Sequence, residues 1–213
     1  ILDFIKNDSK LLPLIDCFPS LASINNKLKQ LNFEFRDVLV KNLTQQYNNT
    51  SFLNGQSKNV QNNISLLLDS KTFTVCTGHQ LSVCLSPLFL IYKITSIIAY
   101  SRYLNQNISG YNCIPCFWMA TEDHDFKEIN TLSIYDKKYS WNIDTKNAVG
   151  NLSTQLIENM LNDVKQVLNH SESGRDLYNI YYHAYTTNSN YADATRSILN
   201  TLFGDYGLIV VDG

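Results

Sequence analysis

Four ionisable residues stand together in the run WMATEDHDF, residues 118–126, where Glu122, Asp123, His124 and Asp125 follow one another directly. Three carboxylates beside one imidazole repel one another and raise at least one pKa, unless a cation, a ligand amine or a hydrogen-bond donor is present. Carboxylates with a histidine suit either a divalent metal ion or general acid/base catalysis, whereas a helix cap would use only one of them. We therefore take these four residues as the candidate catalytic groups.

A second candidate is the stretch Thr77-Gly78-His79-Gln80. A glycine at the end of a strand lets the backbone approach a ligand closely, and a helix that starts soon afterwards offers free N–H groups to an anion. The spacing matches neither a Walker loop nor the GxGxxG fingerprint, so a tight turn is an equally good interpretation. Lys93, in the apolar helix that follows, either faces an anionic ligand or extends outward into solvent.

Cys113 and Cys116 have the CxxC spacing of thiol–disulfide centres and of half of many zinc sites. They lie within a strand-like apolar run, whereas a reactive cysteine favours a helix N-terminus, so buried strand residues are the favoured interpretation. A zinc site would have to recruit His124 with Cys76 or Cys84. We predict no metal.

The composition excludes several classes of function. The chain has 213 residues, 44% of them hydrophobic, and a formal net charge of -2 without any run of Lys or Arg, so nucleic acid and anionic membranes are not expected partners. No apolar run approaches the roughly 18–20 residues that span a bilayer, and the N-terminus has no signal-peptide layout. Five cysteines, an odd number, do not suggest a disulfide framework. We expect a cytoplasmic protein.

The elements that position these residues begin with a strand, a helix and a second strand. A β-branched and aromatic run at 71–78 leads to an apolar helix at 87–104, in which Ser86 is the expected N-cap and Pro87 the first helical residue. This helix is apolar nearly all round, as is typical of a helix packed between layers. A continuous apolar run at 112–120 predicts a parallel strand covered on both faces. Ligands of such βαβ units collect at the carboxyl ends of the strands, where both polar motifs lie.

The rest of the chain is predicted to be mostly helical. Three- and four-residue apolar spacing predicts helices at 20–47 and 57–68 and again at 156–168, around 178–185 and at 191–203. Two short alternating strands follow the acidic run, with Asp136 and Lys137 in the turn between them, and GLIVVDG returns to a buried strand. We expect four segments, in chain order a helical N-terminal segment 1–70, a βαβ core 71–135, a β-hairpin and helical insertion 136–203, and a returning core strand 204–213.

Four motifs together carry a resemblance to a known family: TGHQL, SPLFLIYK, CFWMATEDHDFKEIN and LFGDYGLIVVDG. In order and spacing they resemble the bacterial bacillithiol biosynthesis cysteine-adding enzymes, the BshC family of cysteine ligases. The resemblance implies an α/β fold with a Rossmann-like parallel sheet and flanking helices, like the core of class I aminoacyl-tRNA synthetases and related nucleotidyl transferases, plus an inserted, largely helical connecting segment. The family is longer, so we expect this chain to be its N-terminal part. The chain departs from the family at 85–89, where members usually read Thr-Gly-Pro-Leu-Tyr.

The implied reaction joins the carboxyl of L-cysteine to the amine of glucosaminyl-malate and gives bacillithiol, a low-molecular-weight thiol. Forming an amide from a free carboxylate is uphill in water and normally needs activation, so we expect ATP or ADP as a cofactor, and nothing in the sequence identifies a metal. The resemblance implies a homodimer through a C-terminal coiled coil outside this chain. The implied catalytic and amine-binding residues are those of the acidic run. The implied substrate- or nucleotide-binding residues are Thr77, Gly78, His79, Gln80, Lys93, Trp118 and Asn130.

Two other functions compete with the ligase. A metal-dependent hydrolase would use the same acidic run as its metal site. A non-catalytic module would use these residues to bind a nucleotide or a thiol, and a partner segment would then carry out the chemistry.

Overall fold

A three-stranded parallel sheet forms the centre of the computed structural model, which describes residues 1–213. Its strands are β1 (Thr72–His79), β2 (Asn112–Met119) and β5 (Ile209–Asp212), in the order β1-β2-β5. The central strand β2 is buried from Cys113 to Phe117, because it has a strand on each side and helices on each face, as its continuous apolar run predicts. The predicted βαβ unit is therefore confirmed.

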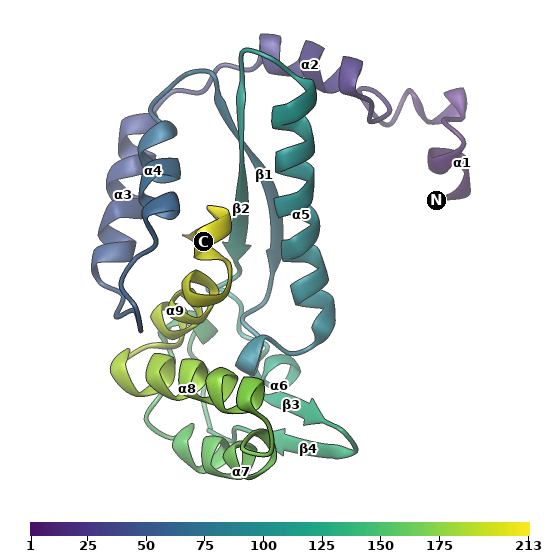
Figure 1. Cartoon of the computed structure of the whole chain (residues 1–213). Helices are drawn as coiled ribbons and strands as arrows, with labels where there is room; N and C mark the ends of the chain where they lie inside the picture. Colours follow the sequence, from purple (N-terminus) through teal and green to yellow (C-terminus); the bar gives the residue numbers. More distant parts are fainter.

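Helices cover the two faces of this sheet (Figure 1). On one side lies the crossover helix α5 (Leu88–Asn107), and on the other lie α3 (Arg36–Asn48) and α4 (Lys58–Leu66). The preceding chain contributes α1 (Leu2–Ile5), the short 3-10 helix η1 (Ser9–Leu11) and α2 (Leu21–Gln30). The side chain of Ser20 accepts a hydrogen bond from the N–H of Ser23 and thereby starts α2 with a capping box.

Two predictions about α5 are wrong. Pro87 has the extended angles φ -84° and ψ 169° and is itself the N-cap, so the helix begins at Leu88 and Ser86 does not cap it. The helix buries only one face against the sheet, with Leu90 and Ile94 inward, while the outer face remains in solvent. Its exposed large side chains are Leu88, Phe89, Tyr92, Tyr100 and Tyr103.

A β-hairpin follows the acidic run. After the short helix α6 (Phe126–Ile129), strand β3 (Thr131–Ile134) pairs antiparallel with β4 (Lys137–Ser140). The turn is formed by Tyr135 and Asp136, not by Asp136 and Lys137, because Lys137 already pairs with Ile134. Tyr135 has a φ of 51°, the left-handed conformation that two-residue hairpin turns require.

A helical layer lies beyond the carboxyl ends of the strands (Figure 1). It contains the 3-10 helix η3 (Val149–Asn151), α7 (Glu158–Leu168), α8 (Glu172–Thr187) and α9 (Tyr191–Phe203). The chain then passes through η4 (Gly204–Tyr206) into β5. A single cluster of 38 buried hydrophobic residues joins this layer to the sheet, so the two parts share one core.

The layer is tied to the loop between β1 and α5, which includes η2 (Val83–Leu85). Tyr191 donates a hydrogen bond of 2.9 Å to the carbonyl of Leu81, and Tyr181 donates one of 3.0 Å to the carbonyl of Cys84. The N–H of Cys84 donates to the hydroxyl of Tyr185 at 3.0 Å. These buried tyrosines therefore fix the loop that carries the chain away from Gln80. None of the helices combines the length and apolar character needed to cross a membrane.

Candidate functional site

The carboxyl ends of the three parallel strands meet in one register. His79 of β1 pairs with Met119 of β2, which in turn pairs with Asp212 of β5. The N–H of Ala120 donates to the carbonyl of His79, and the N–H of Gly213 donates to that of Met119, each at 3.2 Å. Both polar motifs therefore emerge at one edge of the sheet, where open α/β folds bind their ligands.

Gln80 joins the two motifs directly. Its side-chain amide donates to the carboxylate of Asp123 at 2.6 Å and to that of Glu128 at 3.0 Å. One amide between two carboxylates offsets part of their mutual repulsion. This contact brings the TGHQ stretch and the acidic run side by side.

Asp123 has a structural task within the acidic run. Its Oδ1 accepts hydrogen bonds from the backbone N–H groups of His124, at 2.6 Å, and Asp125, at 3.1 Å, so it holds its own loop in a turn. The hydrogen bond from Gln80, followed by that from the N–H of Asp125, lowers the pKa of Asp123. The hydrogen-bond donors that offset the negative charge of Asp123 are thus groups of the protein itself. Asp123 stays ionised and is poorly suited to donate a proton.

The other three members of the run have free side chains. Glu122, His124 and Asp125 are exposed, and the side chain of Asp125 makes no cap hydrogen bond to α6, although it stands at the N-cap position. Their carboxylates and imidazole are therefore accessible to a ligand. Within the run, Asp123 organises the backbone while its neighbours remain available.

A cavity of about 400 Å³ opens beside Glu122, between the ends of β2 and β5 and the helical layer. Its polar side is formed by Thr121, Glu122 and Asp212, and Gly213 borders it. The opposite wall comes from Ala148, Gly150, Asn151 and Ala192. The N–H of Gly150 donates to the carbonyl of Thr121 at 3.0 Å, which fastens this wall to the acidic loop.

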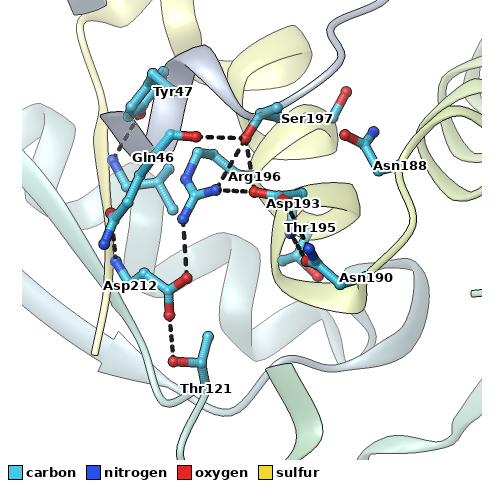
Figure 2. A network of polar contacts seen from close by, with 12 residues as sticks. Gln46, Tyr47, Thr121, Asn188, Asn190, Asp193, Thr195, Arg196, Ser197 and Asp212 are labelled. Atoms are coloured by element: carbon cyan, nitrogen blue, oxygen red, sulfur yellow. Dashed lines mark hydrogen bonds and ion pairs between the residues drawn. The ribbon is translucent and has the colours of Figure 1, made fainter. Parts of the chain in front are cut away.

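A buried arginine organises the Asp212 side of this cavity (Figure 2). The guanidinium of Arg196, with a side chain 1% exposed, contacts Asp193 at 2.5 Å and Asp212 at 3.2 Å. It also donates to the hydroxyl of Thr50 at 2.9 Å. The second oxygen of Asp212 accepts a hydrogen bond from the hydroxyl of Thr121. Asp212 is thus held as a fixed carboxylate at the end of β5.

Sequence reasoning missed Arg196 and Asp212. Arg196 stands within the predicted apolar helix 191–203, where a charge is unusual, and Asp212 ends a buried strand. A charge inside an apolar element requires a partner, so both residues could have been singled out from the sequence. What the sequence does not contain is the pairing of the two residues.

Lys93 and His79 form a separate cluster at the end of β1. Lys93 donates to the carbonyl of Gly78, and its ammonium lies 5.6 Å from the ring centre of Phe89. The ring of His79 packs edge-on against Phe89 at 6.3 Å, and its Nδ1 lies 3.0 Å from the carbonyl oxygen of Gln80. The structure therefore places the Lys93 ammonium at the carboxyl end of β1, next to Gly78.

The remaining candidates lie at different places. Trp118 is 45% exposed and borders Gly78, while Thr77 is half-buried beside it in β1. Asn130 is not brought to the strand ends. Its side chain donates to the carbonyl of Trp141 at 3.0 Å, and its own carbonyl accepts from the N–H of Trp141 at 2.8 Å, so it fastens the hairpin.

No three His, Cys, Asp or Glu side chains are grouped so that they could hold a metal ion. Each carboxylate oxygen of Asp123 already accepts a hydrogen bond. A zinc site or a metal-dependent hydrolase would therefore need a different arrangement of these side chains.

A second, more apolar cavity of about 290 Å³ lies at the other end of the sheet, between α3 and the start of β1. Its lining includes Phe33, Phe35, Leu39, Leu67 and Phe73. It contains few groups that could take part in a reaction. We therefore place the candidate site at the carboxyl ends of the strands.

Comparison with known proteins gives matches along the whole chain. Residues 1–213 match the family model described as "Bacillithiol biosynthesis BshC, N-terminal Rossmann-like domain". The chain is 40% identical to "Putative cysteine ligase BshC" of Flavobacterium psychrophilum, over 100% of this chain and 40% of that protein. Proteins of the same name from Flavobacterium johnsoniae and Bacillus cytotoxicus are 38% and 29% identical, over 100% and 99% of this chain and 40% of each relative. The chain thus spans 40% of the length of these curated relatives, and the expected Rossmann-like fold is confirmed.

Proposed function

We propose a ligase activity from one premise, namely that the chain belongs to the bacillithiol biosynthesis BshC family, whose N-terminal Rossmann-like domain it matches over its whole length. The proposed reaction joins the carboxyl of L-cysteine to the amine of glucosaminyl-malate, forming the amide bond of bacillithiol. The observation that supports this site best is the hydrogen bond of 2.6 Å between Gln80 and Asp123, because it brings both motifs to one edge of the sheet.

The proposed roles within the acidic run differ from one residue to the next. An amine nucleophile arrives mostly as an ammonium ion, which the exposed carboxylates of Glu122 and Asp125 attract. It must lose a proton before or during attack on the carboxyl carbon, and the exposed imidazole of His124 is the group suited to accept that proton. Asp123 positions the loop and does not transfer protons.

Positive charge for the acidic parts of the substrates comes from the end of β1. Lys93 holds its ammonium at the carbonyl of Gly78, beside the imidazole of His79 and the ring of Phe89. These groups are suited to bind the carboxylates of the malate unit or a phosphate group. The two sides of the strand ends would thus hold opposite charges.

ATP is a proposed cosubstrate, since forming an amide from a free carboxylate is uphill in water. When bound, ATP would supply the group that activates the carboxyl. Lys93 and the start of α5, where Pro87 stands as N-cap without a side-chain cap hydrogen bond, are the features that fit its phosphates. Lys93 and the start of α5 bind the negative charge of the phosphates and take no further part in the reaction.

The test is product formation by the complete gene product. The protein is supplied with L-cysteine, glucosaminyl-malate and ATP, and bacillithiol is quantified by mass spectrometry. Replacing His124 with Ala should lower the rate by about 10²-fold or more, the usual contribution of a general base. His170→Ala is the matched control, because His170 is exposed in the turn between α7 and α8.

The outcomes separate the proposals. Full activity of His124→Ala would remove the assigned role of His124, and product formed without ATP would remove the cosubstrate. No product from the folded wild-type protein, together with binding of cysteine or ATP measured by calorimetry, would favour the non-catalytic binding module.

A further inference from the structure

Cys76 and Cys116 are direct neighbours on adjacent strands. Residue 76 of β1 is the register partner of residue 116 of β2, and partners in a parallel pair point to the same face of the sheet. Neighbouring strands are about 4.8 Å apart, which falls within the Cα separation of about 4.4–6.8 Å that a disulfide spans. The backbone therefore needs little movement to allow a bond between the two thiols.

Cys113, the other cysteine of the CxxC motif, is not placed to form a disulfide with Cys116. It lies three residues before Cys116 in an extended strand, so its side chain points to the opposite face. There it packs in a small cluster with Phe73, Leu104 and Ile108. The partner of Cys116 is thus set by strand register and not by sequence spacing.

The two thiols differ in exposure and in acidity. Cys76 is exposed on the edge strand, whereas Cys116 is 5% exposed. The hydrogen bond from the Cys116 thiol, aided by the backbone of Trp118, lowers the pKa of Cys76 to about 7, although burial acts in the opposite direction. Donation of that hydrogen bond and burial both raise the pKa of Cys116. An accessible thiolate beside a buried thiol is the usual arrangement of a nucleophilic and a resolving cysteine.

We propose that Cys76 and Cys116 form a redox-active dithiol that reacts with low-molecular-weight disulfides. The Cys76 thiolate attacks one sulfur of the disulfide RSSR, forming a mixed disulfide on Cys76 and releasing RS⁻. Cys116 then loses its proton and attacks the Sγ of Cys76, forming the Cys76–Cys116 bond and releasing the second RS⁻. In total the protein dithiol is oxidised by two electrons, and RSSR is reduced to two RSH.

The position of this pair gives the modification a structural consequence. Cys76 and Cys116 lie two residues before Gly78 and Trp118, which are neighbours near the carboxyl ends of β1 and β2. A disulfide there would link β1 to β2 next to the strand ends. The dithiol is independent of the proposed ligase reaction, because none of its steps uses the substrates of that reaction.

The test treats the complete protein at pH 7 with bis(2-hydroxyethyl) disulfide, followed by acid quenching and peptide mapping without reduction. Wild-type protein should give the Cys76–Cys116 cross-link, with two equivalents of 2-mercaptoethanol released by this pair in addition to one from each other thiol that forms a mixed disulfide. Cys116→Ala should instead accumulate a stable mixed disulfide on Cys76. Cys76→Ala should leave the buried Cys116 unmodified.

Two further cysteines provide controls. Cys113→Ala should behave like the wild type, because Cys113 faces the other side of the sheet. Cys17, which is exposed, reports how an ordinary accessible thiol reacts under the same conditions. A Cys113–Cys116 cross-link, a wild-type Cys76 that stays unmodified, or a mixed disulfide on wild-type Cys76 that persists as in Cys116→Ala would overturn the proposal.

Discussion

The side-chain amide of Gln80 donates a hydrogen bond of 2.6 Å to the carboxylate of Asp123, across 43 positions of the sequence. The same amide reaches Glu128 at 3.0 Å. Through this contact the loop that leaves β1 and the loop that leaves β2 hold each other in place. The relationship explains how this largely exposed run of acidic residues keeps a defined backbone conformation.

Replacing Gln80 with Glu should disturb this arrangement. The amide donor is lost and a further negative charge is placed between Asp123 and Glu128, so the pKa of Asp123 should rise. The free energy of unfolding should fall by about 1 kcal/mol, because the contact is partly solvated. NMR titration of the Asp123 carboxyl and urea unfolding measure the two effects.

Gln106→Glu is the matched control for this substitution. Gln106 is exposed on α5, so the same chemical change there should leave the pKa of Asp123 and the unfolding midpoint almost unchanged. Equal behaviour of the two variants would show that the contact of Gln80 with Asp123 is not formed in solution.

The lowered pKa of Asp123 predicts a specific pH dependence. A carboxyl whose folded pKa lies below its unfolded value, about 3.9, stabilises the fold fully above that value and loses this contribution as the pH falls through the folded pKa. Asp123→Asn keeps an oxygen acceptor for the turn but has no charge to lose. Wild-type protein should therefore exceed the variant in stability at neutral pH, and the difference should shrink below about pH 4. Urea unfolding across this range measures it, and a difference that grows on acidification would contradict the prediction.

Arg196 should be the most sensitive charged residue of the helical layer. Replacing it with Met leaves the carboxylates of Asp193 and Asp212 without their cation, in surroundings where the arginine side chain is only 1% exposed. Breaking a buried ion pair in this way costs about 3–5 kcal/mol. Arg175→Met, at an exposed position on α8, should change stability by no more than about 0.5 kcal/mol. Similar unfolding free energies of the two variants would show that the network contributes little to stability.

Much of the fold could be predicted from the sequence, because the relevant signals are local. The continuous apolar run at 112–120 and the three- and four-residue spacing of the helices each reflect one element and its own burial. The prediction that α5 packs between two layers is wrong for a related reason. Periodicity reports which residues are apolar, but Phe89 and Tyr92 remain exposed because no element packs over them.

The candidate site could be predicted only in part. The strand-end rule brought TGHQ and the acidic run together, since it depends on strand order alone. Contacts that depend on register or on distant packing were not accessible. Cys76 meets Cys116 through the register of β1 and β2, and Arg196 meets Asp212 because α9 packs beside β5. The hydrogen bond of Asn130 to Trp141, which holds the hairpin, was likewise not accessible from the sequence.

Replacement with Ala should lower stability at Gly150 but leave it unchanged at Gly78, although both glycines lie near the site. A Cβ on Gly78 would meet Trp118 at 3.5 Å or more, an ordinary contact, whereas a Cβ on Gly150 would lie 2.6 Å from the Cβ of Thr121. Gly150→Ala should therefore lose about 1–3 kcal/mol of stability, because the loop that carries Thr121 has to move. Gly78→Ala should unfold like the wild type, so a loss of activity in that variant would report a ligand lying close to the backbone of β1. If Gly78→Ala retained both stability and activity, the close backbone approach expected at this glycine would be excluded, and residue 78 would serve only as part of the strand.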